Sequence, residues 1–188
     1  MKKINVSIQG LTPLLQNRFI QASIEGKSMR KVGALKDLDP TDKLYKLPNG
    51  KIYQPANHFE MCLVNAAKNF QIRGKKRSTY SKLFGCALQV MPEAIVHKIQ
   101  KYDLFETTAV NPNTKGRTLV VRPRFPKWEL DFTIEILEEG IPEEVVKEVL
   151  DYAGRFVGVG DWRPDKRGKF GKFMVTKFQV EGEKKSKK

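Results

Sequence analysis

Apolar and polar residues alternate in several segments with the period of two that a half-buried β-strand requires. Residues 4–10 show this alternation and predict a first strand that ends at a glycine. The segments 117–124 and 128–137 are also β-rich, flank a short proline-containing turn, and are expected to pair as a hairpin. A last strand is predicted over 170–180, with a bulge or a change of face within it.

Two other segments repeat apolar residues at the spacing of an amphipathic helix. The first helix is expected over 58–70, and Asn57 followed three residues later by Glu60 resembles a capping box at its start. The second is expected to begin at Pro142, because proline suits the first helical position, and to end near Gly158. Each helix therefore carries one apolar stripe.

The segments between these elements have weaker patterns. Residues 11–43 lack a sustained period and are rich in Lys, Gly, Ser and Asp, which predicts a long loop of functional or mobile character. Residues 44–53 resemble a small hairpin, because a Pro-Asn-Gly sequence supplies its turn. A short helix is expected over 78–84 before a break at Gly85, and irregular strands over 88–110.

The order of the main elements is β-α-β-β-α-β. This order predicts an α+β fold of the ferredoxin-like (RRM-like) kind, with long insertions before the first helix and before the second strand. With 188 residues and 40% apolar content, the chain can bury one sizeable core. We expect a single domain over 1–181 and a basic, disordered tail over 182–188.

The charge of the chain is strongly positive. Lys and Arg number 35 against 21 Asp and Glu, a net charge of +14, which favours a polyanionic partner such as nucleic acid. No run approaches the roughly 18 apolar residues that a membrane span needs, and no apolar secretion signal begins the chain. A cytoplasmic protein with no membrane partner is expected.

Cysteine and histidine are scarce. Cys62 and Cys86 lack metal-ligand spacing and are expected to be buried, reduced thiols. With only two histidines in the chain, no zinc site is predicted, and no other metal or cofactor is expected.

The most informative segment lies between the second helix and the last strand. Its glycines permit close backbone approach, its cations suit phosphates, and its aromatic rings offer faces on which bases stack. The residues concerned are Gly158, Gly160, Trp162, Arg163, Lys166, Arg167, Lys169, Phe170, Gly171, Lys172 and Phe173. The alternative is a helix-to-strand turn whose aromatic rings fill the core and whose cations are solvated. A nucleotide-binding loop is disfavoured because such a loop follows a strand and opens a helix.

Three more basic clusters occur elsewhere, and each taken alone is typical of a solvated face. Together with the glycine-rich segment they would form one groove, and the sheet face and rim of a ferredoxin-like fold commonly bind single-stranded RNA. The clusters are Lys27, Arg30, Lys31 and Lys36; Arg73, Lys75, Lys76 and Arg77; and Lys115, Arg117, Arg122, Arg124 and Lys127.

Signals for catalysis are weaker. His58, at the start of the first helix, has the chemistry of a general base, although a lone histidine near a helix end is more often structural. Asp37, Asp39 and Asp42 crowd one loop and have the chemistry of magnesium ligands, although loop acids are usually solvated.

Two segments carry a resemblance to a known family. The run KIYQPANHFEMCLVNAA (51–67) and the run GVGDWRPDKRGKFGKF (158–173), together with the order of elements, resemble the RAMP superfamily of ferredoxin-like RNA-binding proteins. The likeness is greatest to the backbone subunits that polymerise along the guide RNA of CRISPR effector complexes. The chain is also similar to uncharacterised phage-encoded proteins that share its TPLL and GDWRP sequences.

The resemblance implies where RNA and chemistry would lie. It places single-stranded RNA on Gly158, Gly160, Arg163, Lys166, Arg167 and Gly171. Some members cleave RNA with an aspartate after the first strand or a histidine near the first helix, for which Asp37, Asp39 and His58 are the matching positions.

These observations predict a non-enzymatic, sequence-tolerant binder of single-stranded RNA or DNA, with RNA favoured, that assembles side by side along the strand or with other effector subunits. Two alternatives stay open. One is an endoribonuclease that uses the loop aspartates or His58. The other is a phage structural or assembly protein whose basic surface meets an acidic protein partner.

Overall fold

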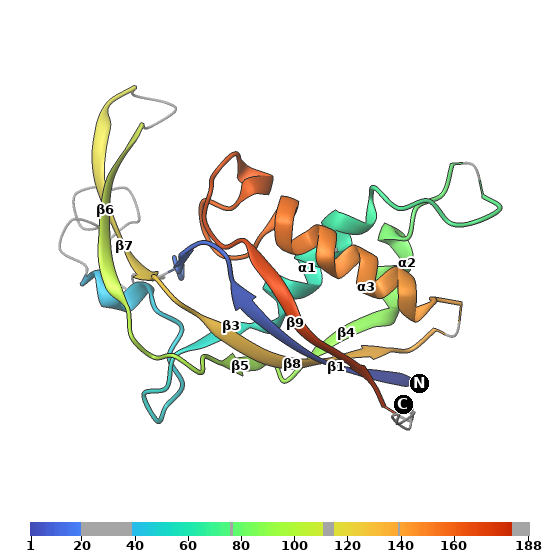
Figure 1. The fold of residues 1–188 in the computed structure, drawn as a ribbon. Helices are drawn as coiled ribbons and strands as arrows, with labels where there is room; N and C mark the ends of the chain where they lie inside the picture. The colour runs from blue at the N-terminus through green and yellow to red at the C-terminus, as the bar shows by residue number, and fades with distance from the viewer. Residues whose placement is uncertain (20–38, 76, 111–114, 139, 182–188) are drawn as a thin grey trace, which may run out of the picture.

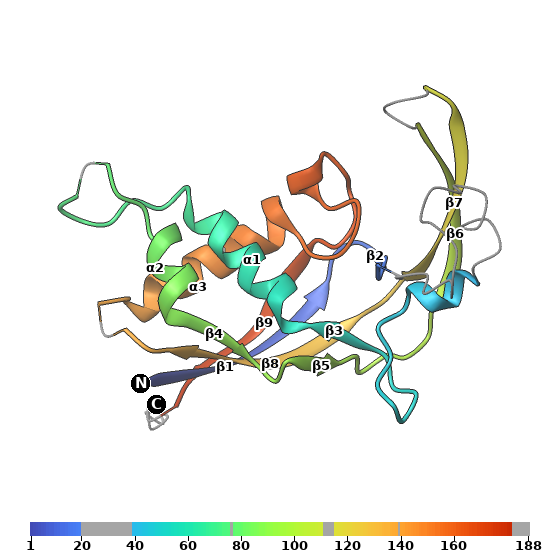
Figure 2. The same ribbon diagram turned by 180° about the vertical axis from the view of Figure 1, so that it is seen from behind.

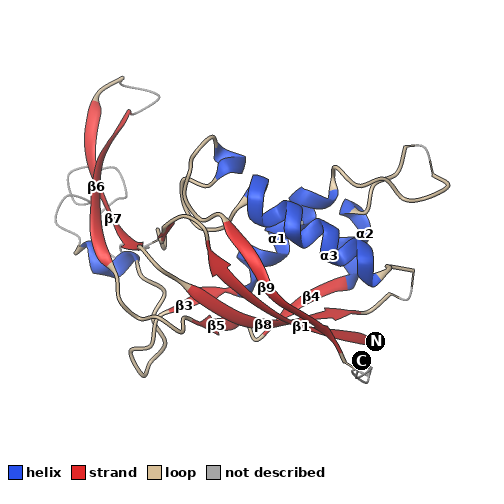
Figure 3. Cartoon of the chain, viewed as in Figure 1, coloured by secondary structure: helices blue, strands red, loops and turns tan. Residues whose placement is uncertain are grey.

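The computed structural model describes residues 1–19, 39–75, 77–110, 115–138 and 140–181. These residues form antiparallel sheets and three α-helices, which confirms the predicted α+β class (Figure 1, Figure 3). The strands are β1 (Lys2–Gly10), β2 (Leu14–Leu15), β3 (Tyr53–Pro55), β4 (Leu88–Met91), β5 (Ala94–Val96), β6 (Asp103–Val110), β7 (Arg117–Phe125), β8 (Glu129–Ile136) and β9 (Phe173–Val180). The helices are α1 (Ala56–Ala67), α2 (Ser81–Ala87) and α3 (Glu143–Tyr152), with 3₁₀ turns η2 (Pro40–Lys43) and η4 (Pro164–Lys166) and a π-helical turn η3 (Ala153–Val157).

A four-stranded antiparallel sheet organises the molecule. Its strand order is β4-β8-β1-β9, and in chain order the elements around it are β1, α1, β4, β8, α3 and β9. The helices lie together on one face of this sheet (Figure 1). None of the helices in the described residues is both long and apolar enough to cross a membrane.

The main core lies between that sheet and the helices. Phe132 of β8 packs on Phe59 of α1 with ring centroids 4.8 Å apart. Trp128, which precedes β8, is 1% exposed and donates from its indole Nε1 to the Thr12 carbonyl oxygen at 2.8 Å. A Cβ on Gly10 would lie 2.1 Å from that Nε1, so only glycine at the end of β1 leaves room for the indole.

The predicted first and last strands are confirmed. β9 pairs with β1 through a register shift between Ser7 and Ile8, because Lys177 pairs with Ser7 while Val175 pairs with Ile8. One extra residue therefore bulges from β9, and this bulge restores the apolar face of the strand to the core.

The face of the four-stranded sheet opposite the helices is polar. β1 places Asn5 and Ser7 there, with Lys177 and Gln179 of β9 as their cross-strand partners. β8 adds polar residues at alternate positions, namely Glu129, Asp131, Thr133 and Glu135. In the described residues this face presents no aromatic ring from β1, β8 or β9, so it lacks the stacking platform through which a ferredoxin-like sheet binds bases.

The predicted hairpin of 117–124 with 128–137 is wrong. β7 instead pairs with β6 and β2 in a separate sheet, whereas β8 pairs with β1 and β4. The buried alternation of β8 belongs in the main core, so the chain leaves one sheet for the other at Pro126. The β6–β7 ribbon stands away from the helix layer at one end of the molecule (Figure 1, Figure 2).

The predicted position of the second insertion is also wrong. The second strand of the main sheet is β4, at 88–91, and the added segment that contains β5, β6 and β7 follows this strand instead of preceding it. Short β4 was hidden among weakly patterned residues, which explains the error.

Three local predictions need correction. The Asn57–Glu60 capping box is wrong, because Pro55 precedes α1 without a side-chain cap and Glu60 accepts from the Val90 amide at 2.9 Å. The helix break at Gly85 is wrong, since α2 continues to Ala87. Cys62 is buried as predicted, but Cys86 is exposed because it lies on the α2 face opposite the packed Phe84.

Other local predictions are confirmed. Gly50 has φ of 79° and its amide donates to the Leu47 carbonyl at 2.9 Å, which closes the expected turn within 44–53. Pro142 directly precedes α3, and the helical path continues through η3 to Gly158.

Candidate nucleic-acid interface

The glycine-rich loop, residues 158–172, lies beside β2 and the N-terminal half of α1. Main-chain hydrogen bonds hold it there: the Asp161 amide donates to the Leu15 carbonyl at 2.9 Å, and the Gly171 amide donates to the Pro13 carbonyl at 2.8 Å. The loop also closes on itself, because the Val159 amide donates to the Gly171 carbonyl at 3.0 Å. It is therefore a pinned, compact segment.

The glycines of this loop serve its own packing. A Cβ on Gly171 would lie 1.8 Å from the Val159 carbonyl oxygen, and one on Gly168 would lie 1.7 Å from the Trp162 carbonyl oxygen. Gly160 meets Leu15 in the same way, at 2.5 Å from its carbonyl oxygen. The sequence predicted a close approach to the backbone at these glycines, and in the structure it is other backbone segments of the same chain that approach them.

The aromatic residues of the loop extend a stack from the β6–β7 ribbon. Phe170 is 6% exposed and contacts Phe105 of β6 and Trp162, with ring centroids 5.3 and 6.1 Å away. The Arg122 guanidinium lies 5.9 Å from the centre of the Trp162 ring. Trp162 is 39% exposed and is the most accessible ring of this stack, because Phe105 is half-buried and Phe170 is covered.

Charged side chains join β7 to the glycine-rich loop, to η2 and to β6. Arg122 pairs with Asp161 at 2.5 Å, and Lys43 donates to the Val121 carbonyl at 2.7 Å. Burial, followed by the nearby Arg122 charge, lowers the pKa of Lys43. Arg124 is occupied by a two-pronged hydrogen bond to Asp103, at 2.8 and 2.7 Å.

Two adjoining cavities form a groove between the glycine-rich loop and α1. The first, which we call the donor cavity, has a volume of about 330 Å³ and is lined by Asn57, His58, Met61, Cys62, Asn65, Val159, Gly160, Arg163 and Lys166. The second has a volume of about 190 Å³ and is lined by Leu15, Gln16, Asn17, Tyr45, Gln54, His58, Gly160, Asp161 and Arg163. Both share His58, Gly160 and Arg163, so these three residues mark the centre of the groove.

The donor cavity has the chemistry of an anion site. Its described lining includes no carboxylate, while Arg163, Lys166, Asn57 and Asn65 all supply N–H donors. Both cations have a partner beside the cavity: Arg163 donates to the Gly160 carbonyl at 3.2 Å and to the Asp165 carboxylate at 3.3 Å, and Lys166 Nζ lies 3.9 Å from the same carboxylate.

His58 lies half-buried at the centre of the groove. Its Nδ1 is 2.6 Å from Gln54 Nε2, and the edge of the ring meets the Tyr45 ring at a centroid distance of 5.5 Å. Burial, followed by the Arg163 charge, lowers the pKa of His58. Gln54 in turn belongs to a buried amide network with Gln16.

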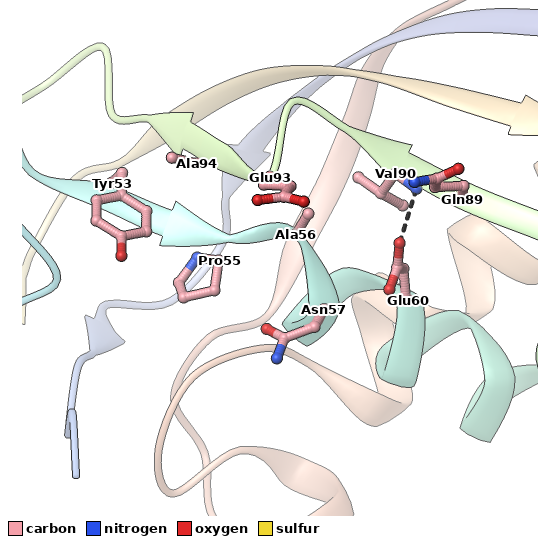
Figure 4. Close-up of a pocket in the computed structure, with 9 residues that line it drawn as sticks. All are labelled: Tyr53, Pro55, Ala56, Asn57, Glu60, Gln89, Val90, Glu93 and Ala94. Carbon is pink, nitrogen blue, oxygen red and sulfur yellow. Dashed lines mark hydrogen bonds between the residues drawn. The ribbon is translucent and has the colours of Figure 1, made fainter. Parts of the chain in front are cut away.

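A third cavity, larger than either of these two, differs from them in charge. It has a volume of about 410 Å³ and lies between α1 and strands β3, β4 and β5 (Figure 4). Its polar lining includes the carboxylates of Glu60 and Glu93 and no lysine or arginine among the described residues. A polyanion is repelled there, so size alone does not identify the binding site.

The basic clusters that lie within the described residues do not all converge on one groove. Arg73, Lys75 and Arg77 lie beyond the C-terminal end of α1, whereas the glycine-rich loop lies near its start (Figure 1, Figure 2). Lys115 and Arg117 lie toward the outer end of the β6–β7 ribbon, while Arg122 lies beside the loop. Within the loop, Arg167 and Lys169 are exposed and Lys172 is half-buried. Lys76 and the cluster within 27–36 lie outside the described residues.

The predicted acidic site receives no support from the described part of the chain. Asp39 caps η2 by accepting from the Thr41 amide at 2.8 Å, and this hydrogen bond lowers the pKa of Asp39. In the part of the chain that the structure describes, no three or more His, Cys, Asp or Glu side chains lie close enough together to hold a metal ion. Asp42 is exposed, and Asp37 lies outside those regions.

Several groove residues were not among the binding residues predicted from the sequence, although three of them lie in the 51–67 run. Gln16, Gln54 and Tyr45 come from separate strands and loops, and Asn57 and Asn65 lie on the outward side of α1. No local pattern distinguishes these amides from solvated ones, so only the fold brings them together.

Comparisons with known proteins found likeness in structure only. The sequence matches no protein-family model and no curated relative. Its fold matches a chain in the "Cryo-EM structure of the Type III-B Cmr-beta bound to cognate target RNA", with a TM-score of 0.53 and 16% identity. The match covers 95% of this chain and 60% of that chain, so this chain spans only 60% of its neighbour's length.

Proposed function

We propose that this protein binds single-stranded nucleic acid, RNA in preference to DNA, in the groove between the glycine-rich loop and α1. The observation that carries the proposal is the donor cavity, where two cations and two amides converge without a carboxylate in the described lining. Phosphodiester groups are the polyanion that such donors suit, and the net charge of +14 attracts them.

The fold supports the same proposal. We infer a ferredoxin-like core of the RAMP kind from the β1-α1-β4-β8-α3-β9 order and the β4-β8-β1-β9 sheet. The neighbour in fold belongs to a Type III-B Cmr assembly bound to target RNA, which favours RNA and other protein subunits as partners. Side-by-side assembly along the strand is part of this proposal.

A single strand suits the groove better than a duplex. Trp162 offers a partly exposed ring beside the groove, and such a ring stacks on bases only when they are unpaired. In this arrangement Arg163 and Lys166 bind the backbone, and the indole holds a neighbouring base.

The test is fluorescence anisotropy with matched single-stranded RNA, single-stranded DNA and duplex DNA. The Arg163→Ala, Lys166→Ala double variant is compared with Lys3→Ala, Lys177→Ala, which removes the same charge from the open sheet face. We expect the groove variant to lose about tenfold or more in affinity for single strands, and the control about twofold or less. Equal losses in both variants would reduce the proposal to non-specific attraction.

The two alternatives have their own discriminating measurements. Labelled RNA incubated with and without magnesium, for the wild type and the His58→Ala and Asp37→Ala variants, tests the endoribonuclease. The ratio of absorbance at 260 and 280 nm before and after nuclease treatment tests the assembly protein, because a protein with only acidic protein partners carries no nucleic acid.

A further inference from the structure

A chain of buried amide side chains leads from the interior of the protein to the groove and ends at His58. We propose that His58 is a neutral hydrogen-bond donor whose Nε2–H binds a phosphate oxygen of the nucleic acid, and that Gln16 and Gln54 determine this tautomer. The phosphate part of this inference rests on the proposed function, whereas the tautomer part does not.

The orientation of the Gln16 amide is determined by the main chain. Gln16 Oε1 accepts from the Tyr45 backbone N–H at 3.0 Å, and Gln16 Nε2 donates to the Tyr53 backbone carbonyl at 2.9 Å. A backbone N–H can only donate and a backbone carbonyl can only accept. The reversed amide would face N–H with N–H and oxygen with oxygen, so only one orientation is stable.

The orientation of Gln54 follows from that of Gln16. Gln16 Nε2 also donates to Gln54 Oε1 at 3.0 Å, which leaves Gln54 Nε2 as the end that faces His58. Both glutamines are almost fully buried, at 1% and 0% exposure, so water cannot compensate for a reversed amide.

The tautomer of His58 is the last step of this chain. Gln54 Nε2 lies 2.6 Å from His58 Nδ1, and an amide NH₂ has only hydrogens to offer. Nδ1 must therefore accept, which places the proton of the neutral ring on Nε2. Protonation at Nδ1 would set donor against donor. Burial and the Arg163 charge, which lower the pKa of His58, also oppose the doubly protonated ring.

This tautomer suits the groove. His58 lines both cavities, and Nε2 has no hydrogen-bond partner among the described residues. Arg163 and Lys166 supply the positive charge of the donor cavity, so a neutral N–H adds direction without adding repulsion between cations. The same arrangement disfavours His58 as a general base, because Gln54 occupies Nδ1 and Nε2 carries the proton.

The tautomer is tested by nitrogen-15 NMR of the histidine rings, without any nucleic acid. The chain has only two histidines, so a His97→Phe variant assigns the spectrum. We expect His58 to be protonated at Nε2 alone at pH 7, and Gln54→Glu to move a proton onto Nδ1, because a carboxylate can only accept. A wild-type ring that is protonated at Nδ1 would overturn the inference, whatever the protein binds.

The contact with phosphate is tested by oligonucleotide binding to variants that melt at the wild-type temperature. We expect His58→Phe to weaken single-stranded RNA binding about five- to thirtyfold, and His58→Gln, whose amide extends a donor to the same place, to recover most of that loss. If Arg163→Ala, Lys166→Ala weakens binding while His58→Phe does not, the groove stands and the His58 contact fails. If neither weakens binding, the proposed function itself fails.

Inorganic phosphate distinguishes a nucleic-acid site from a site for small anions. We expect the His58 Nε2–H resonance to shift on addition of the oligonucleotide and to stay in place with the same concentration of inorganic phosphate. An equal shift with both ligands would overturn the assignment to nucleic acid.

Discussion

At the scale of single residues, substitutions at two glycines with the same backbone conformation distinguish the cost of backbone strain from the cost of a steric clash. Gly171 and Gly50 have φ of 71° and 79°, but a Cβ meets the Val159 carbonyl oxygen at 1.8 Å in the first and nothing within 4 Å in the second. We expect Gly50→Ala to lower the free energy of unfolding by about 1–2 kcal/mol, from backbone strain alone. Gly171→Ala should lower it by more than about 3 kcal/mol, because the loop must open as well.

Urea unfolding of the two variants provides the comparison. Equal losses of stability at both positions would show that the loop relaxes easily around an added methyl group. In that case the glycines would be left free for a ligand, as the sequence alone had suggested.

A second residue-scale prediction concerns His97 and acid. His97 is 2% exposed, and burial lowers its pKa from 6.5 to about 4. As the pH falls, the His97 ring therefore gains a proton near pH 6.5 in the unfolded chain but only near pH 4 in the folded protein. The resulting stability is fully present above pH 6.5 and is lost as the pH falls toward 4, by roughly 3 kcal/mol in all.

His97→Phe removes this dependence. The ring of His97 stacks on Phe125 with centroids 4.7 Å apart, and phenylalanine has the shape to keep that contact. We expect the difference in unfolding free energy between variant and wild type to shift in favour of the variant as the pH is lowered from 7 to 5. A constant difference over that range would show that His97 gains a proton in the folded state.

At the scale of elements, the ion pair between Arg122 and Asp161 joins the β6–β7 ribbon to the glycine-rich loop. Its side chains are 15% and 31% exposed, against 34% and 45% for the Arg124–Asp103 pair that lies within the ribbon. Asp161→Asn leaves Arg122 beside Lys43 with reduced compensation. We expect Asp161→Asn to destabilise the fold by about 1–3 kcal/mol and the control Asp103→Asn by less than about 1 kcal/mol.

Thermal unfolding of both variants checks this ordering. The same drop in melting temperature for Asp103→Asn and Asp161→Asn would indicate that the loop stays in place through its main-chain hydrogen bonds to β2. The Arg122–Asp161 ion pair would then add no more to stability than a surface ion pair does.

At the scale of the whole molecule, we expect the positive charge and the groove to make different contributions to the proposed binding of RNA. We expect the affinity for single-stranded RNA to fall steeply with salt, because each neutralised phosphate releases condensed counterions. The Arg163→Ala, Lys166→Ala variant should reduce the slope of log affinity against log salt by about 1.4, that is, about 0.7 for each lost phosphate contact. A salt-independent affinity would contradict an electrostatic interface altogether.

The sequence by itself determined the elements whose pattern depends only on near neighbours. The alternation over 4–10 and within 128–137, the apolar stripe after Pro142 and the Pro-Asn-Gly turn all appear where they were predicted. Local backbone preferences and amphipathic period suffice for these, because each is set by residues a few positions apart. The net charge, on which the expectation of a polyanionic partner rests, is likewise a property of composition.

Only the tertiary structure decided which elements pair and what fills the space between them. β8 joined β1 and β4 instead of its sequence neighbour β7, because its buried face had to share a core with α1. The environment of His58 was equally hidden, since it depends on Gln16, 38 residues before its partner Gln54. Pairing and hydrogen-bond networks follow from which surfaces exclude water together, and no local pattern records that.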